Sequence, residues 1–162
     1  IDELWKNDPE MQQLAQQYDE RPANRILSRK INEFDNSIPH NVAQRQFDMI
    51  RQIADNGESA IFVGRCADYA LAGRPGLLRI FCRADLGQRI RRIEQRHNLS
   101  KKKAALLVAK TDRHRRVYYH HHTGQFWGHS SCYDLTVNTG VLGVEKTAET
   151  MEAFIRTFWE QD

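Results

Sequence analysis

Three short apolar runs alternate with longer amphipathic stretches along the chain. The runs cover residues 60–63, 77–82 and 133–138. Their continuous apolar character predicts strands that are buried on both faces, as in a parallel sheet. The stretches between them repeat apolar residues every three or four positions, which predicts helices. This alternation predicts an α/β fold with parallel strands.

Four helices are predicted beside these strands. The first covers residues 41–56 and ends at Gly57, a residue that favours the left-handed C′ position. The second follows Asp85, a good N-cap residue, with Gln88 at the spacing of a capping box. The third begins after the N-cap Ser100 and runs to about residue 119. The fourth carries an apolar stripe that would lie on the sheet, formed by Val144, Ala148, Met151, Ile155 and Phe158. Two shorter helical pieces are predicted at residues 10–18 and 24–34.

Charge is distributed unevenly along this chain of 162 residues, whose length suits a single domain. The net charge is only +3, but residues 83–116 hold twelve Lys and Arg against three acidic residues. Half of all the basic residues therefore sit in about a fifth of the chain, which indicates an anionic partner or a solvated face. Asp112 and Arg116 have the spacing of a helical ion pair, which leaves Arg115 as the freer guanidinium.

The cysteines and histidines predict neither a disulfide framework nor a metal site. Cys66, Cys82 and Cys132 are scattered and show no CxxC spacing, which favours a reducing compartment such as the cytoplasm. Residues 120–122 are three consecutive histidines. Neighbouring helical positions diverge by about 100°, so three in a row do not converge on one ion. No apolar run approaches the length of a membrane span, and no membrane partner is expected.

The most informative polar residues follow the predicted strand at residues 60–63. Gly64 ends that strand, and Arg65 and Asp68 come next. Ligands of open α/β sheets bind at the carboxyl ends of strands, and an arginine there can hold a phosphate with its planar fork. A solvated Arg–Asp pair at a strand end is the alternative interpretation.

Several motifs, in order and at these intervals, carry a resemblance to a known family. They are Phe62-Val63-Gly64-Arg65-Cys66-Ala67-Asp68-Tyr69, Lys110-Thr111-Asp112 with Arg115 and Tyr118-Tyr119, Thr123-Gly124 with Trp127-Gly128, Tyr133-Asp134-Leu135 with Asn138-Thr139 and Leu142-Gly143, and Asp19-Glu20-Arg21-Pro22. Together they resemble the cytidylate kinase-like family of P-loop nucleoside monophosphate kinases, over about residues 15–155.

The resemblance implies a fold and a reaction. The fold is a three-layer α/β/α parallel sheet of P-loop kinase type in a single domain over residues 1–162, with a lid at about residues 100–130. The reaction is transfer of the γ-phosphoryl group of ATP, with Mg²⁺, to a nucleoside monophosphate such as CMP or dCMP. To catalyse such a transfer, a protein has to position the substrates and supply positive charge, and it does little covalent chemistry.

The resemblance also implies roles for individual residues. Arg65 would hold the phosphate of the acceptor, and Asp68 would orient the acceptor nucleoside or hold Arg65. Asp112 and Arg115 would be the catalytic residues of the lid helix. The remaining candidates are Arg45 for a second phosphate contact, and Asn138, Thr139 and Arg113 for the ATP side.

One part of the family pattern does not occur. No GxxxxGK[ST] motif, which cradles donor phosphates, is found in residues 1–162. We therefore expect the parent protein to carry an upstream strand and phosphate loop, without which ATP turnover is in doubt.

Two other functions stay open at this stage. One is an inactive relative that keeps Arg65 and Arg115 only for nucleotide binding. The other is a nucleic-acid-binding protein that uses the basic residues 89–116. The absence of aromatic residues between positions 83 and 116 argues against it, because such proteins stack bases on aromatic side chains. The accepted base and the oligomeric state, a homo-oligomer among the possibilities, are not determined by the sequence.

Overall fold

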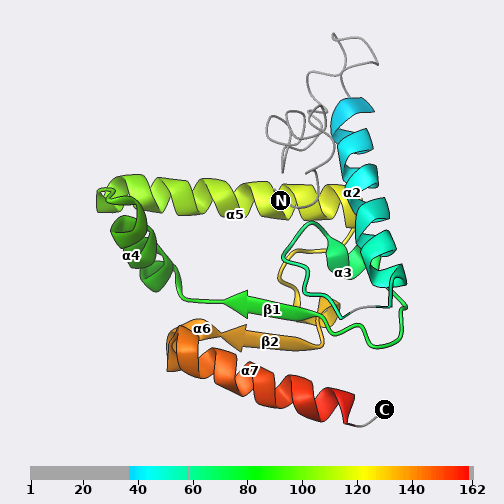
Figure 1. Cartoon of the computed structure of the whole chain (residues 1–162). Helices are drawn as coiled ribbons and strands as arrows, with labels where there is room; N and C mark the ends of the chain where they lie inside the picture. Colours follow the sequence, from blue (N-terminus) through cyan, green and yellow to red (C-terminus); the bar gives the residue numbers. More distant parts are fainter. Residues whose placement is uncertain (1–36, 58, 161–162) are drawn as a thin grey trace. The chain divides into compact units, whose positions relative to one another are not determined.

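The computed structural model describes residues 37–57 and 59–160, and Figure 1 shows a helix-rich α/β chain with a small parallel sheet. The elements in chain order are α2 (Ser37–Asp55), α3 (Ala67–Ala70), β1 (Ile80–Arg83), α4 (Leu86–His97), α5 (Lys101–Thr123), the 3-10 turn Ser130–Cys132, β2 (Leu135–Asn138), α6 (Thr139–Leu142) and α7 (Val144–Trp159). The helical pieces predicted at residues 10–18 and 24–34, and the motif at residues 19–22, lie outside the described residues.

The described residues form two compact units. The first, called the α2 unit, contains α2, α3 and the segment His114–Gln125 at the end of α5. The second, called the sheet unit, contains both strands with α4, α6, α7 and the first part of α5. Helix α5 thus contributes residues to both units.

The α2 unit has the denser core. Ala43, Phe47 and Ile50 of α2 are buried at the spacing that the amphipathic pattern predicts. Helix α2 contacts α3, whose Ala67 and Ala70 are also buried. The predicted helix at residues 41–56 is confirmed, and Gly57 follows it with a φ of 76°, the left-handed conformation expected of a C′ glycine.

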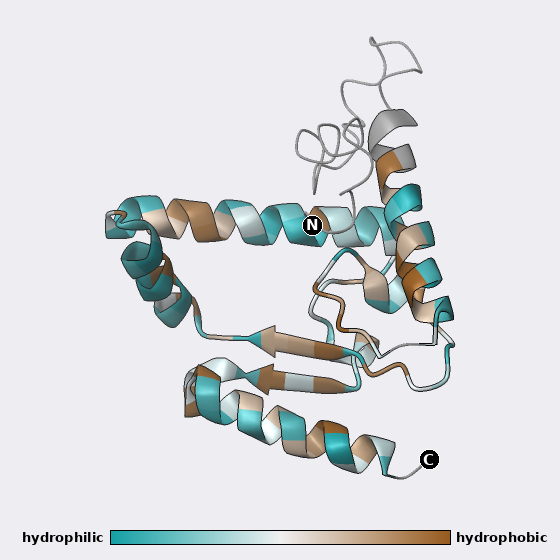
Figure 2. Ribbon diagram, in the orientation of Figure 1, coloured by the Kyte–Doolittle hydropathy of each residue, from teal (hydrophilic) through white to brown (hydrophobic). Residues whose placement is uncertain are grey.

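The sheet unit is built on one parallel pair of strands. Ile80 faces Leu135 and Arg83 faces Asn138, so the predicted parallel pairing is confirmed. The predicted burial on both faces is wrong, since Ile80 and Phe81 are half-buried and Cys82 and Arg83 are exposed. In Figure 2 both strands carry hydrophobic colours, yet among the described residues each strand has a single neighbour, and one pairing cannot enclose it.

An ion pair between Arg79 and Asp134 joins the two segments that lead into the strands. The Arg79 guanidinium donates to both oxygens of Asp134 at 2.6 and 3.0 Å, and the Arg79 backbone N–H donates to Asp134 at 2.8 Å. The Arg79 carbonyl in turn accepts from the N–H groups of Asp134 and Leu135. The two strands begin directly after these contacts, two to three residues later than predicted.

The strand predicted at residues 60–63 is absent from the structure. These residues form no ladder, and Ile61 and Val63 are 94% and 89% exposed. A strand with two apolar faces is stable only between neighbouring strands, and the described residues place none beside this segment. Arg65 consequently lies in a turn rather than at the carboxyl edge of a sheet.

The remaining helices occur where the sequence predicts them, but the apolar stripe predicted for α7 is not buried, since Val144 is 48% exposed and Thr147 is the buried residue of that helix. Helices α4, α5 and α7 begin near the predicted positions, and the Ser100 hydroxyl accepts from the Lys103 N–H at 3.4 Å as an N-cap. The predicted capping box is wrong, because the Asp85 side chain caps nothing and Gln88 bonds elsewhere. In the described part of the chain, no helix combines the length and apolar character that crossing a bilayer requires.

We predict that Asp134→Asn destabilises the sheet unit by about 1 kcal/mol at pH 7, less than is usual for charged hydrogen bonds because both side chains are about one-third exposed. The hydrogen bonds from Arg79 hold the pKa of Asp134 below its ordinary value of 3.8. The stabilisation is therefore complete above about pH 5 and is lost as the pH falls through the lowered pKa. Urea unfolding at pH 7 and pH 3 measures both effects. Asp85→Asn is the control, and equal effects of the two variants at pH 7 contradict the assignment.

Candidate functional site

A strained turn carries the first candidate residue. Gly64, Arg65 and Cys66 have φ values of 73°, 59° and 53°, three successive left-handed residues. For residues other than glycine this conformation costs about 1–2 kcal/mol each, and such strain concentrates at functional sites. The turn is held by its neighbours, since the Gly64 carbonyl accepts from Ala67 N–H and the Cys66 carbonyl accepts from Ala70 N–H. The backbone therefore fixes the point from which the Arg65 side chain departs.

Arg65 lies close to a second cation of the same unit. Burial is the largest cause that lowers the pKa of the Arg65 guanidinium, and the positive charge of Arg115 lowers that pKa further. Tyr118 and Cys66 act in the opposite direction. The two guanidiniums, one from the turn before α3 and one from α5, are thus near enough for their charges to interact. Both arginines that the sequence singled out therefore belong to the α2 unit.

Two adjacent tyrosines fix α5 within the α2 unit. The Tyr119 hydroxyl donates to Asp68 at 2.6 Å, a short charge-assisted hydrogen bond. The Tyr118 hydroxyl donates to the buried amide oxygen of Gln46 at 3.3 Å. These bonds join the part of α5 that carries Arg115 to α3 and to α2. Asp68 therefore lies in the same unit as Arg65 and Arg115, with one oxygen occupied by Tyr119.

The other predicted site residues divide between the units. Arg45 is exposed on α2, beside the buried Gln46. Arg113 is exposed on α5 and belongs to the sheet unit, as do Asp112, Asn138 and Thr139.

Asp112 is the most enclosed carboxylate among these candidates. Its side chain is 15% exposed, and Arg89 Nη1 donates to its two oxygens at 2.7 and 2.9 Å. The predicted pairing of Asp112 with Arg116 is therefore wrong, because the carboxylate faces α4 and is bound from there. The sequence did not predict Arg89 as a site residue of the kinase-like site. It only placed Arg89 within the basic residues of segment 83–116.

The turn after β2 is held by side chains on both sides. The Asn138 side chain accepts from the Gly140 N–H at 3.0 Å, and the Thr139 hydroxyl donates to the Arg83 carbonyl at 3.2 Å. Gln88 of α4 donates from its amide to the Gly140 carbonyl at 3.0 Å. The sequence assigned Gln88 to a capping box, and no local pattern indicated this contact across 52 residues.

The loop at residues 123–128 is pinned at one end. Trp127 packs edge-on against Phe81 of β1, with ring centroids 5.3 Å apart. A Cβ at Gly128 would lie 2.9 Å from the Phe81 ring, so the loop approaches the strand as closely as a glycine permits. Phe126 is 70% exposed.

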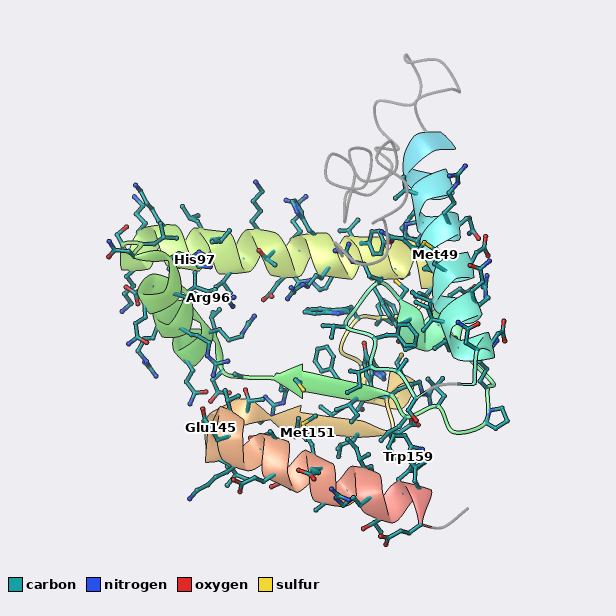
Figure 3. The ribbon with its side chains drawn as sticks, viewed as in Figure 1. Met49, Arg96, His97, Glu145, Met151 and Trp159 are labelled. Carbon is teal, nitrogen blue, oxygen red and sulfur yellow. The ribbon has the colours of Figure 1, made fainter. Side chains whose placement is uncertain are left out.

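The histidines and the cavity on α7 offer no comparable site. His122 packs its ring against Phe47 and Tyr118. Among the described residues, no group of three or more His, Cys, Asp or Glu could hold a metal ion. A cavity of about 410 Å³ is lined by residues of α7, among them Met151 and Trp159, which Figure 3 labels, and the ion-paired Glu152 and Arg156. The rest of its lining is apolar, and its one cation, Arg156, is paired with Glu152.

Comparison with known proteins agrees with this combination of motifs. The pattern that defines the cytidylate kinase-like family matches residues 2–141. A crystal structure of an uncharacterized protein from Eubacterium ventriosum ATCC 27560 is similar, with a TM-score of 0.71 and 25% sequence identity over 91% of this chain and 89% of that chain. No curated protein matches the sequence.

We predict that Tyr119→Phe destabilises the α2 unit by about 1 kcal/mol, because Asp68 loses a charge-assisted hydrogen bond but remains partly solvated. Tyr69→Phe, which removes the hydroxyl of an exposed tyrosine in the same unit, is the matched control. Urea unfolding followed by fluorescence measures both. A Tyr119→Phe protein as stable as the control contradicts the anchoring role.

Proposed function

Because this chain belongs to the cytidylate kinase-like family, we propose that it binds a nucleoside monophosphate such as CMP or dCMP and transfers to it the γ-phosphoryl group of ATP. The observation that carries the proposal is the pairing of Arg65 and Arg115 within one unit. Family membership supports kinase-like handling of nucleotides, and the arginine pair supports a site for their phosphates.

A phosphate would resolve the unfavourable features of this pair. The Arg65 guanidinium is half-buried on a left-handed turn, and the positive charge of Arg115 contributes to lowering its pKa. A phosphate dianion accepts charge-assisted hydrogen bonds from both and turns the repulsion into attraction. In phosphoryl transfer the same charges stabilise the negative charge of the transferring group.

The proposal gives each acceptor-side residue a role. Arg65 holds the phosphate of the monophosphate, and Arg115 reaches the phosphoryl group in transfer. Asp68, oriented by Tyr119, accepts a hydrogen bond from the acceptor nucleoside. Arg45 supplies a second phosphate contact. Asp112 acts at the lid helix in the orientation that its ion pair with Arg89 gives it.

The donor side of the proposal lies in the sheet unit. Asn138 and Thr139 adjoin the adenine of ATP and Arg113 contacts its phosphates. Mg²⁺ is generally bound by nucleotide phosphates together with one or two carboxylates, so the described residues fit an ion that arrives with ATP rather than one held by a protein cluster. The proposal extends to the fold, a three-layer P-loop kinase domain over residues 1–162 with a lid at about residues 100–130. Three free cysteines support action in the cytoplasm.

We predict that Arg65→Ala and Arg115→Ala each weaken binding of the preferred monophosphate by about tenfold or more, since each removes a charge-assisted contact. Titration calorimetry with CMP, dCMP, UMP and AMP measures binding, and a coupled assay with ATP and Mg²⁺ on the full-length parent protein measures turnover. Arg65→Lys separates charge from geometry, because lysine keeps the charge and loses the planar fork.

Arg96→Ala is the matched control, since Arg96 lies exposed in the last turn of α4 (Figure 3). Unchanged binding in Arg65→Ala and Arg115→Ala would refute the site. Binding without turnover would identify an inactive nucleotide-binding relative, and salt-dependent binding of RNA or DNA without affinity for mononucleotides would favour a nucleic-acid-binding function.

A further inference from the structure

Gln88 makes an unusually close contact with the turn after β2. Its amide nitrogen donates to the Gly140 carbonyl at 3.0 Å. A Cβ placed on Gly140 would lie 1.9 Å from the Gln88 amide oxygen, far inside any allowed contact. The side chain of Gln88 therefore occupies the space that every residue other than glycine would need at position 140.

The contact between Gln88 and Gly140 carries an energetic penalty, and it restrains the turn after β2. The Gln88 amide oxygen is buried and has no hydrogen-bond partner among the described residues. Leaving a buried acceptor unpaired is unfavourable, whereas the same side chain on a solvated helix face would lose nothing. The contact restrains the backbone of the turn at Gly140. The Gly140 N–H is bound by Asn138 and the Gly140 carbonyl by Gln88, so both backbone groups of this residue are held.

Two consecutive residues of α4 make contacts with two different parts of the sheet unit. Gln88 binds the turn after β2, and Arg89 binds Asp112 on α5. Both contacts lie within the sheet unit. Because one residue serves the turn and the next serves α5, substitutions can test the two contacts independently.

We propose that Gln88 is a positioning residue for ATP, which holds the Asn138–Gly140 turn in the conformation that receives the donor nucleotide. This inference rests on the proposed function, which places the ATP side at Asn138 and Thr139. Gln88 acts through the turn and does not touch the nucleotide. A merely structural residue would affect stability alone, whereas a positioning residue of this turn affects ATP and leaves the monophosphate unaffected.

Gln88→Ala is expected to raise the Kd and the KM for ATP by about fivefold, the effect of one neutral hydrogen bond. The Kd for the monophosphate and the kcat at saturating ATP stay unchanged. Gln95→Ala is the matched control, a glutamine of the same helix that is exposed to solvent. Binding is measured with the fluorescent analogue mant-ATP and by calorimetry with ATP and CMP, and thermal unfolding monitors stability.

Gly140→Ala provides a second variant with no penalty from backbone conformation, because Gly140 lies within α6 and has no positive φ. The added methyl group displaces the flexible end of Gln88 and breaks the same hydrogen bond. Gly140→Ala should therefore weaken ATP binding as much as Gln88→Ala does, and the double variant should bind no more weakly than either single variant. Such non-additivity is the signature of a shared contact.

The outcomes separate this inference from the function on which it rests. A wild-type chain that binds neither ATP nor a monophosphate overturns both. A wild-type chain that binds ATP, with Gln88→Ala binding equally well, overturns the positioning role alone. Equal weakening of ATP and CMP binding, or additive effects of the two substitutions, also overturns it, because the contact would then act on the fold as a whole.

Discussion

The candidate site depends on the contacts that hold the segments carrying Arg65 and Arg115 within one unit. Two positive charges do not approach each other in a folded protein unless other contacts hold them there. Here a left-handed turn directs Arg65, and two tyrosine hydrogen bonds fix the part of α5 that carries Arg115. These contacts hold in place the backbone segments of the two arginines to which the proposed function assigns the phosphates. Preorganised charge of this kind is the main contribution that a protein makes to phosphoryl transfer.

The sheet unit depends on polar contacts between distant residues more than on a large core. Its buried hydrophobic side chains, among the described residues, are Ala104 and Val108 of α5. The strand pair is closed by Arg79 and Asp134, α4 is joined to α5 by Arg89 and Asp112, and α4 is joined to the turn after β2 by Gln88. Directional contacts of this kind fix geometry at single points.

The residues of the proposed site are divided between the two units. The acceptor-side candidates Arg65, Asp68 and Arg115 belong to the α2 unit, and the donor-side candidates Asn138 and Thr139 belong to the sheet unit. Helix α5 carries Arg115 in one unit and Asp112 in the other.

The sequence by itself determined the family, the helices, the parallel pairing of the two strands and the residues worth testing. These depend on local periodicity, on capping residues such as Ser100 and on motif order, all of which are encoded within short stretches. Only the tertiary structure decided that residues 60–63 form no strand, that Asp112 binds Arg89 instead of Arg116, and that Gln88 binds Gly140 instead of capping its helix. Each of these depends on which partner is within reach across tens of residues, and a local pattern contains no information about that partner. A strand requires a neighbour and a side chain bonds to the group it can reach, so the same residues take a different role once the chain has folded.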